Sequence, residues 1–130
     1  MTYENGSLIS FQMDQYLYPY HSAHGSHLFL GFVFDLQTGN LLSLQDLFLL
    51  NEEFVQTINN IMIQTIEEED IPIFDFTAFK GLDDTVEFYL KKAELVLVYQ
   101  EYAYTPYYYG PLVFTIPLSD LASYLNPNFF

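Results

Sequence analysis

Hydrophobic and polar positions alternate along a run from Ser7 to Tyr18. The apolar set comprises Ile9, Phe11, Met13 and Leu17, and the set between them includes Ser10, Gln12 and Asp14. A period of two residues is typical of a half-buried β-strand. Asn5-Gly6 precedes this run and favours a type I′ hairpin turn. We therefore expect Met1 to Glu4 to be the stub of a first strand that continues upstream in a longer protein.

A second run, from His27 to Leu36, carries apolar side chains on both of its faces. Such a pattern is typical of a strand at the centre of a sheet, and we expect this run to lie there. A turn over residues 37–40 and a single helical turn over residues 43–48 follow. Residues 86–91 and 95–99 alternate again around a tight connection, so they predict a hairpin.

The best helical pattern runs from about Glu52 to Glu68. Its apolar stripe consists of Phe54, Ile58, Ile61, Met62, Thr65 and Ile66. Asn51 is the predicted N-cap, and the carboxylates of the first turn favour the helix dipole. The acidic residues 67–70 oppose the dipole at the other end, which indicates a solvated helix terminus.

The remaining elements complete a mixed fold. Residues 71–76 are predicted to be extended, residues 112–116 form a final strand, and Ser119 caps a short helix through about Tyr124. The predicted class is α+β, with an antiparallel β-sheet packed against one main α-helix and a short C-terminal helix. The length of 130 residues indicates one domain over residues 1–130, which we expect to be part of a longer protein with an upstream module.

The charge of the chain is strongly one-sided. It has 17 Asp and Glu against three lysines and no arginine, for a formal net charge of -14. A nucleic acid needs a basic patch that displaces its counterions, so no nucleic-acid partner is expected. The same charge attracts a basic protein or a cation. No run of 18 apolar residues is present, so we expect no membrane insertion by this chain.

All three histidines, His21, His24 and His27, lie within seven residues. Imidazole is the commonest metal ligand, and Asp14 or Asp35 could complete a zinc site. However, residues three apart in an extended chain point to opposite faces. We therefore expect a structural loop here, with no metal and no cofactor. The absence of cysteine also removes zinc-thiolate sites and thiol nucleophiles.

Motifs for nucleophilic catalysis or phosphate binding are missing. The sequence has no G-x-S-x-G elbow and no glycine-rich phosphate fingerprint. Paired carboxylates of the glycosidase type remain compatible with the 17 acidic residues, although no spacing favours a particular pair. We therefore assign no catalytic residue.

The tyrosine loop, residues 102–110, is the most informative constellation. It contains Tyr102, Tyr104, Pro106, Tyr107, Tyr108 and Tyr109. Tyrosine combines a large apolar ring with a hydroxyl group, so it is enriched at binding surfaces. The alternative interpretation is packing over the edge of a sheet.

Taken together, these motifs resemble the RsiV-type C-terminal domain, a bacterial domain of unknown function. It occurs in lysozyme-responsive anti-sigma factors, in peptidoglycan deacetylases and in secreted or lipid-anchored proteins. The matching residues are Tyr16, Tyr18, Ser22-Ala23-His24-Gly25, Asp35, Thr38-Gly39, Leu47-Phe48, Tyr102, Pro106, Tyr107 and Gly110. One departure is His21-Ser22, where the family has Thr or Gly followed by Gly.

This resemblance implies an extracytoplasmic location in a cell-envelope protein and no catalysis by the domain itself. In some members it implies binding of a basic wall-degrading enzyme such as lysozyme. The binding residues expected on this basis are His24, Gly25, Tyr20, Tyr102, Pro106, Tyr107 and Gly110. We expect the two loops that carry them to lie near each other at one end of the sheet.

Two other hypotheses stay open at this point. The first is a cell-wall enzyme, or its substrate-binding module, that uses His24 and nearby tyrosines as general acid or base in a pocket. The second is a purely structural accessory domain.

Overall fold

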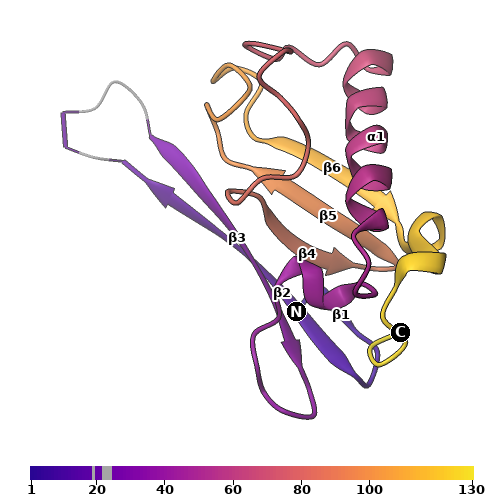
Figure 1. Cartoon of the computed structure of the whole chain (residues 1–130). Coiled ribbons are helices and arrows are strands. Elements are labelled where there is room, and N and C mark those ends of the chain that lie inside the picture. Colours follow the sequence, from indigo (N-terminus) through magenta and orange to yellow (C-terminus); the bar gives the residue numbers. More distant parts are fainter. Residues whose placement is uncertain (19, 22–24) are drawn as a thin grey trace.

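The computed structural model describes residues 1–18, 20–21 and 25–130 (Figure 1). Its elements in chain order are β1 (Tyr3–Glu4), β2 (Leu8–Leu17), β3 (Ser26–Asp35), η1 (Leu44–Leu47), α1 (Glu53–Glu68), β4 (Glu87–Lys91), β5 (Glu94–Tyr99), β6 (Leu112–Pro117) and η2 (Leu118–Tyr124). The strand pairs are antiparallel, so the predicted α+β class is confirmed. No helix within the described ranges combines the length and the apolar character needed to cross a membrane.

A long hairpin of β2 and β3 dominates the first sheet, whose order is β1-β2-β3. The two strands pair along their whole lengths, from Leu8 with Asp35 to Leu17 with Ser26. β1 adds only at the base of the hairpin, opposite residues 9–10. Figure 1 shows the outer part of the hairpin extending away from the rest of the molecule.

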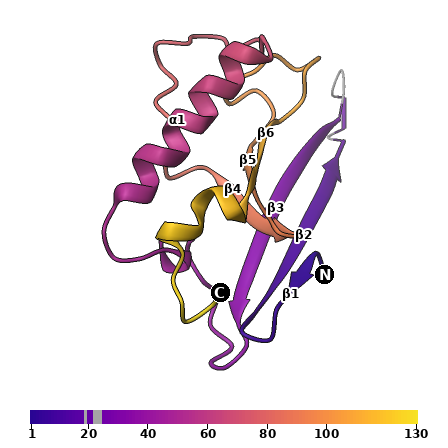
Figure 2. The ribbon, with the colours of Figure 1, turned by 90° about the vertical axis from the view of Figure 1, so that its right-hand side faces the viewer.

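The second sheet, in the order β4-β5-β6, forms the core together with α1. The buried stripe of α1 consists of Phe54, Ile58, Met62 and Ile66. Every second residue of β6 is buried, and every residue of β5 after Glu94 is buried, as expected for the central strand. Figure 1 and Figure 2 together show that this sheet lies between α1 and the hairpin.

The two sheets meet where the edge of β4 crosses the base of the hairpin. The backbone N–H of Leu90 donates a 2.8 Å hydrogen bond to Oγ of the fully buried Ser10. Gly31 lies against the backbone of Phe88, and a Cβ at Gly31 would be only 1.9 Å from the Phe88 carbonyl oxygen. The crossing therefore requires a glycine at position 31.

The predicted apolar face of β2 is largely exposed, whereas in a usual amphipathic strand the apolar face is buried. The alternation predicted a half-buried strand, and Leu8 and Ser10 are fully buried against the second sheet. Phe11, Met13 and Leu17, from the apolar set, are 37%, 51% and 45% exposed. Because bulky side chains at the crossing would hold the two sheets apart, the face that carries the small Ser10 is turned inward and the apolar face is turned to solvent.

The prediction that residues 27–36 form a central strand is wrong. β3 lies at the end of its sheet, and β2 is the central strand. The continuous apolar run has another cause: one face of β3 packs on the second sheet around the fully buried Val33, while the other belongs to the exposed apolar face of the hairpin.

Three local predictions also need correction. α1 begins at Glu53 with Glu52 as its N-cap, so Asn51 lies one position too early to cap it. The short C-terminal helix is a 3-10 helix that follows Pro117, and the predicted cap at Ser119 lies inside it. Residues 71–76, predicted to be extended, contain no strand.

Candidate binding surface

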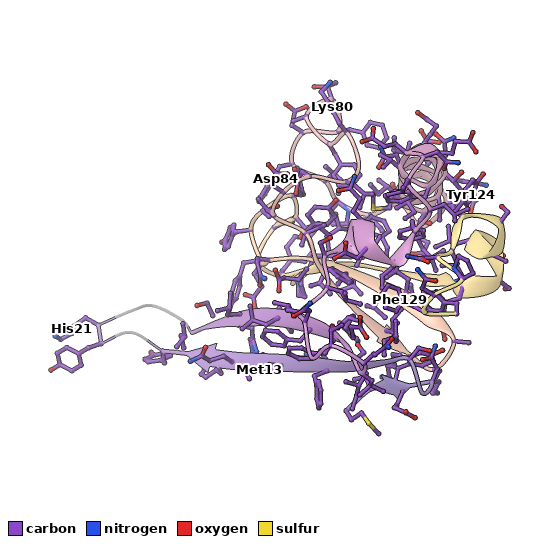
Figure 3. The ribbon with its side chains drawn as sticks, turned by 60° about the horizontal axis from the view of Figure 1, so that its bottom comes forward. Met13, His21, Lys80, Asp84, Tyr124 and Phe129 are labelled. Carbon is purple, nitrogen blue, oxygen red and sulfur yellow. The ribbon has the colours of Figure 1, made fainter. Side chains whose placement is uncertain are left out.

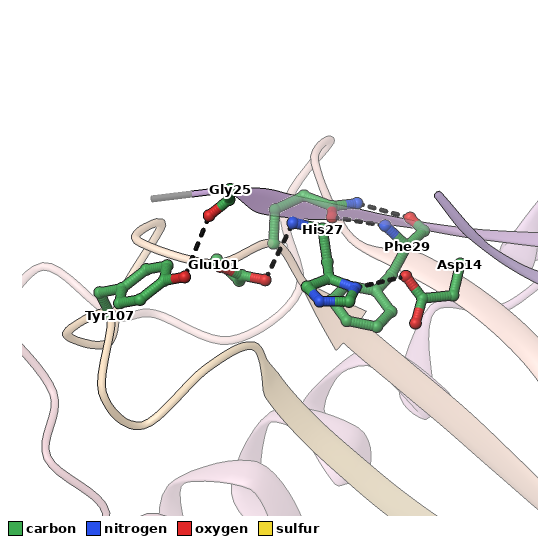
Figure 4. Close-up of polar contacts among 7 residues, drawn as sticks. Asp14, Gly25, His27, Phe29, Glu101 and Tyr107 are labelled. Atoms are coloured by element: carbon green, nitrogen blue, oxygen red, sulfur yellow. Dashed lines mark hydrogen bonds and ion pairs between the residues drawn. The ribbon is translucent and has the colours of Figure 1, made fainter. Parts of the chain in front are cut away.

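The tyrosine loop contacts the end of the histidine-containing segment. The hydroxyl of Tyr107 donates a 3.0 Å hydrogen bond to the carbonyl oxygen of Gly25 (Figure 4). Gly25 in turn is covered by Tyr16 of β2, since a Cβ at Gly25 would lie 2.0 Å from the Tyr16 hydroxyl oxygen. The predicted proximity of the two segments is therefore confirmed for Gly25 and Tyr107.

Aromatic rings continue from Tyr107 along the surface of the loop. Tyr102 stacks on Tyr107 with a centroid distance of 5.8 Å, and Phe74 stacks on Tyr102 with a centroid distance of 6.2 Å. Tyr102 and Phe74 are more than half exposed. Phe74 is fixed beside the loop because its backbone N–H donates to the carbonyl oxygen of Tyr104. We call Phe74, Tyr102 and Tyr107 the aromatic row.

A second group of rings lies on the hairpin face that carries Tyr16. The His27 ring lies 4.9 Å from the ring of Tyr16 and 5.7 Å from that of Phe29. Its Nδ1–H donates to the carboxylate of Asp14 at 2.8 Å, and both side chains remain partly exposed. The imidazole is therefore held by stacking and by one carboxylate.

Side chains from β4 and from the residues that follow β5 occupy the outer edge of β3. The backbone N–H groups of His27 and Phe29 donate to the side chains of Glu101 and Gln100, respectively (Figure 4). The Gly31 N–H donates to the side chain of Glu87. Gln100 also donates through Nε2 to the Phe29 carbonyl oxygen, at 2.6 Å. These bonds replace the neighbouring strand that the edge lacks.

The tyrosine loop is held in shape by bonds within itself. The hydroxyl of the fully buried Thr105 donates to the carbonyl oxygen of Gly110, and the Gly110 N–H donates to the Tyr107 carbonyl oxygen. Gly110 has a φ of 88°, in the left-handed region that glycine adopts without steric cost. Tyr102 has a φ of 68°, so this residue turns the chain into the loop at some conformational cost.

A partly buried contact ties the loop to the turn before β4. The hydroxyl of Tyr104 donates to the carboxylate of Asp83, and this bond, with burial, raises the pKa of Tyr104 to about 12. Burial acts to raise the pKa of Asp83 itself, but hydrogen bonds from Thr85 and Tyr104 outweigh that effect and hold the pKa below its ordinary value. The carboxylate is therefore charged at neutral pH and positions the loop.

The environment of the Tyr107 hydroxyl is also electrostatically unfavourable for its ionised form. Desolvation raises the pKa of Tyr107, and the carboxylate of Glu101 and the hydroxyls of Tyr16 and Tyr102 act in the same direction. Tyr107 is therefore a neutral hydrogen-bond donor over the physiological range.

The predicted binding residues divide into three groups. Gly25, Tyr102 and Tyr107 come together as described above, and Gly110 and Pro106 shape the loop, the latter by accepting the N–H of Tyr109. Tyr20 is 90% exposed and packs on His21 at the far end of the hairpin, as the position of His21 in Figure 3 shows. His24 lies outside the described residues.

No cluster of three or more His, Asp or Glu suited to a metal ion occurs in residues 1–18, 20–21 and 25–130. The histidine triad cannot be assembled from these residues because His24 lies outside them. A surface depression of about 820 Å³ lies elsewhere, lined by residues 40–50 and 126–129 in part. Its carboxylate, Asp46, accepts the N–H of Ser43 in a helix capping box.

Sequence reasoning missed the residues that close the β3 edge. Gln100 and Glu101 follow a buried strand directly and carry no motif. Their partners lie 71 and 74 residues away along the chain, so only the crossing of the two sheets brings them together. Asp14, a candidate metal ligand from the sequence, instead accepts a hydrogen bond from His27.

The fold defines an α+β domain of two three-stranded antiparallel sheets and one main helix, with an aromatic surface where the hairpin meets the tyrosine loop. The chain belongs to the family described as "Protein of unknown function (DUF3298)", which matches residues 45–119. No curated protein matches the chain.

Two solved structures have a similar fold. A DUF3298 family protein from Pseudomonas aeruginosa PAO1 has a TM-score of 0.69 and 20% sequence identity. The match covers 95% of this chain and 58% of the Pseudomonas protein's chain. A member of the same family from Bacteroides fragilis NCTC 9343 has a TM-score of 0.73 and 21% sequence identity. The match covers 94% of this chain and 50% of the Bacteroides protein's chain. The chain thus spans between half and three-fifths of the length of these relatives.

Proposed function

We propose that this chain is an RsiV-type member of the family and serves as a non-catalytic, extracytoplasmic binding domain for a basic protein such as lysozyme. The observation that carries the proposal is the aromatic row, with Phe74 and Tyr102 more than half exposed, near the carboxylate of Glu101, together with the carboxylate of Asp14 on the adjoining hairpin. Such a surface can bind the lysines and arginines of a basic partner, because their cationic groups contact aromatic faces and form ion pairs with carboxylates.

The distribution of charge supports the same partner. No lysine or arginine precedes Lys80 in the sequence, so the whole hairpin lacks a permanent positive charge. The net charge of -14 accelerates association with a cationic protein at low ionic strength.

The polar groups of this surface favour binding over catalysis. The Glu101 carboxylate accepts the His27 N–H, the Asp14 carboxylate accepts the His27 ring N–H, and Tyr107 donates to a backbone carbonyl. Groups that are held in this way position the surface. A general acid or base would instead have to face a reacting atom.

The aromatic row also supports a second candidate, a substrate-binding module for the cell wall. Phe74 and Tyr102, which are more than half exposed, offer flat apolar rings on which the pyranose rings of peptidoglycan could stack. This candidate predicts sedimentation of the protein with insoluble peptidoglycan, independently of salt.

Calorimetric titration of the purified chain with lysozyme tests the leading proposal. We expect binding at low salt that weakens at an ionic strength of about 0.15 M. Glu101→Gln and Tyr102→Ala should each weaken binding by roughly tenfold, which corresponds to the loss of one charged or aromatic contact. Tyr108→Ala is the matched control, because Tyr108 is 81% exposed and its ring lies outside the aromatic row.

Absence of lysozyme binding at low salt would contradict this choice of partner. Equal effects of Tyr102→Ala and Tyr108→Ala would show that the aromatic row is not the contact surface. Binding to peptidoglycan without binding to lysozyme would favour the second candidate.

A further inference from the structure

β2 has an outer edge that begins where β1 ends. The N–H of Leu36 donates to the Ser7 carbonyl oxygen, so odd-numbered residues of β2 direct their backbone groups toward β3. The Ser10 carbonyl oxygen accepts from Thr2 on the opposite side. By the alternation of an antiparallel ladder, the backbone groups of residues 12, 14 and 16 also point outward.

This edge is open along the outer half of the hairpin. The pairing of β1 ends at Ser10. Among the described residues, no hydrogen bond occupies the outward backbone groups of Gln12, Asp14 and Tyr16. All residues from Phe11 to Leu17 are exposed. An unpaired row of N–H and C=O groups on an exposed strand is a template for an added strand.

The two faces beside this edge differ in chemistry. Phe11, Met13 and Leu17 lie on the outer face, where Figure 3 shows Met13 on the projecting hairpin. On β3, Phe32 and Leu30 lie opposite Phe11 and Met13, and Leu28 and Phe34 lie opposite Gln15 and Ile9, so β3 extends the apolar surface. The inner face presents Asp14 and the ring of Tyr16. An added strand would therefore meet apolar side chains on one face, and a carboxylate and a tyrosine on the other.

We propose that the open edge of β2 binds an extended segment of a basic partner as an additional antiparallel strand, with basic and apolar residues alternating along it. The apolar residues would pack beside Met13 and Leu17, and the basic residues would pair with Asp14 and lie over Tyr16. This inference rests on the proposed function and names the part of the partner that the hairpin recognises. β-strand addition supplies affinity through the main chain and specificity through alternate side chains.

Charge separates this occupant from a second copy of the chain. A two-fold pairing of β2 with itself would bring two Asp14 side chains and two net charges of -14 together. The edge of β6 is a weaker template, because Pro111 and Pro117 lie on either side of its short central part.

The test uses the complete chain and the probe peptide acetyl-Lys-Val-Lys-Val-Lys-Val-Lys-amide. Two further peptides carry backbone N-methyl groups, one on every lysine and one on every valine. Neighbouring residues of a strand direct their N–H groups to opposite sides. Only one of the two methylated peptides should therefore lose affinity, by at least about tenfold, whereas binding by side chains alone would respond equally to both.

A variant on each edge provides a second readout. Met13→Lys places a positive charge on the exposed outer face of β2 and should weaken peptide binding by about tenfold through repulsion and lost apolar contact. Val113→Lys is the matched control on β6, where Val113 is 42% exposed. Amide exchange in the complex should slow at Gln12, Asp14 and Tyr16.

The outcomes separate the two proposals. Lysozyme binding without a difference between the methylated peptides, or with protection confined to β6, overturns strand addition and leaves the proposed function standing. Self-association that buries the same three amides in the absence of peptide also overturns it, in favour of a second copy. Peptide binding with the expected pattern, but without lysozyme binding, supports strand addition and contradicts lysozyme as the partner.

Discussion

The two edges of the β2–β3 hairpin differ in how their outward backbone N–H and C=O groups are bonded. On β3, the side chains of Glu87, Gln100 and Glu101 bond the outward backbone groups. On β2, the corresponding groups of residues 12, 14 and 16 face solvent. An exposed strand edge risks aggregation, so proteins usually cover or charge it. The closed edge contributes to stability, whereas the open edge is available to a partner.

The position of the second sheet explains this difference. β4 crosses only the inner face at the base of the hairpin, where Gly31 allows backbone contact. From there the end of β5 and the following residues run beside β3, and no described element pairs with the outer half of β2 on the side away from β3. Two predictions test this comparison and a third tests the anchoring of the tyrosine loop, from the largest expected effect to the smallest.

Gly31→Ala should disturb the crossing of the two sheets, on which the difference between the two edges depends. The new Cβ would lie 1.9 Å from the Phe88 carbonyl oxygen, a backbone atom that cannot move alone. We expect the free energy of unfolding in urea to fall by about 3 kcal/mol. Gly25→Ala is the control, because its Cβ meets the movable end of the Tyr16 side chain and should cost less than about 1 kcal/mol. Equal losses would contradict the crossing.

Gln100→Ala and Gln12→Ala compare the two edges directly. Removal of the Gln100 side chain leaves both the N–H and the C=O of Phe29 without their partner. We expect a loss of about 1–2 kcal/mol in the free energy of unfolding. Gln12 is exposed on the open edge, so its replacement should change stability by less than about 0.5 kcal/mol. A larger loss for Gln12→Ala would show that the β2 edge is structurally occupied.

Tyr104→Phe should have the smallest effect, and that effect should depend on pH. The pKa of Asp83 is lower in the folded protein than in the unfolded chain. The charged carboxylate therefore stabilises the fold at a pH above the unfolded pKa, and this stability is lost as the pH falls through the folded pKa. Without the Tyr104 hydroxyl, the difference in unfolding free energy between about pH 7 and about pH 3 should become smaller. An unchanged pH dependence, measured by urea denaturation, would contradict the role of this bond.

Periodicity predicted most of the elements but not their mutual arrangement. The alternation in β2 and the stripe of α1 identified both elements, because each pattern follows from local backbone geometry. The sequence could not tell which face of β2 is buried, because that depends on the small residues Ser10 and Gly31 at a crossing of two sheets. Hydrophobicity alone favoured the opposite orientation.

The candidate surface was predictable only in part. The tyrosine loop was recognisable by composition, and its contact with Gly25 followed from the expected approach of two segments. The closing residues Gln100 and Glu101 were not recognisable, since any polar residue at a strand end has the same local pattern. Their role arises from contacts 71 and 74 residues apart in the chain.

Hydrogen exchange at six backbone amides of the free protein tests the comparison most directly. His27, Phe29 and Gly31 donate to side chains, so their amides should exchange at least about a hundredfold more slowly than unprotected amides. The outward amides of Gln12, Asp14 and Tyr16 should exchange almost without protection. Similar protection in the two sets would contradict the open β2 edge, and with it the surface proposed for the partner.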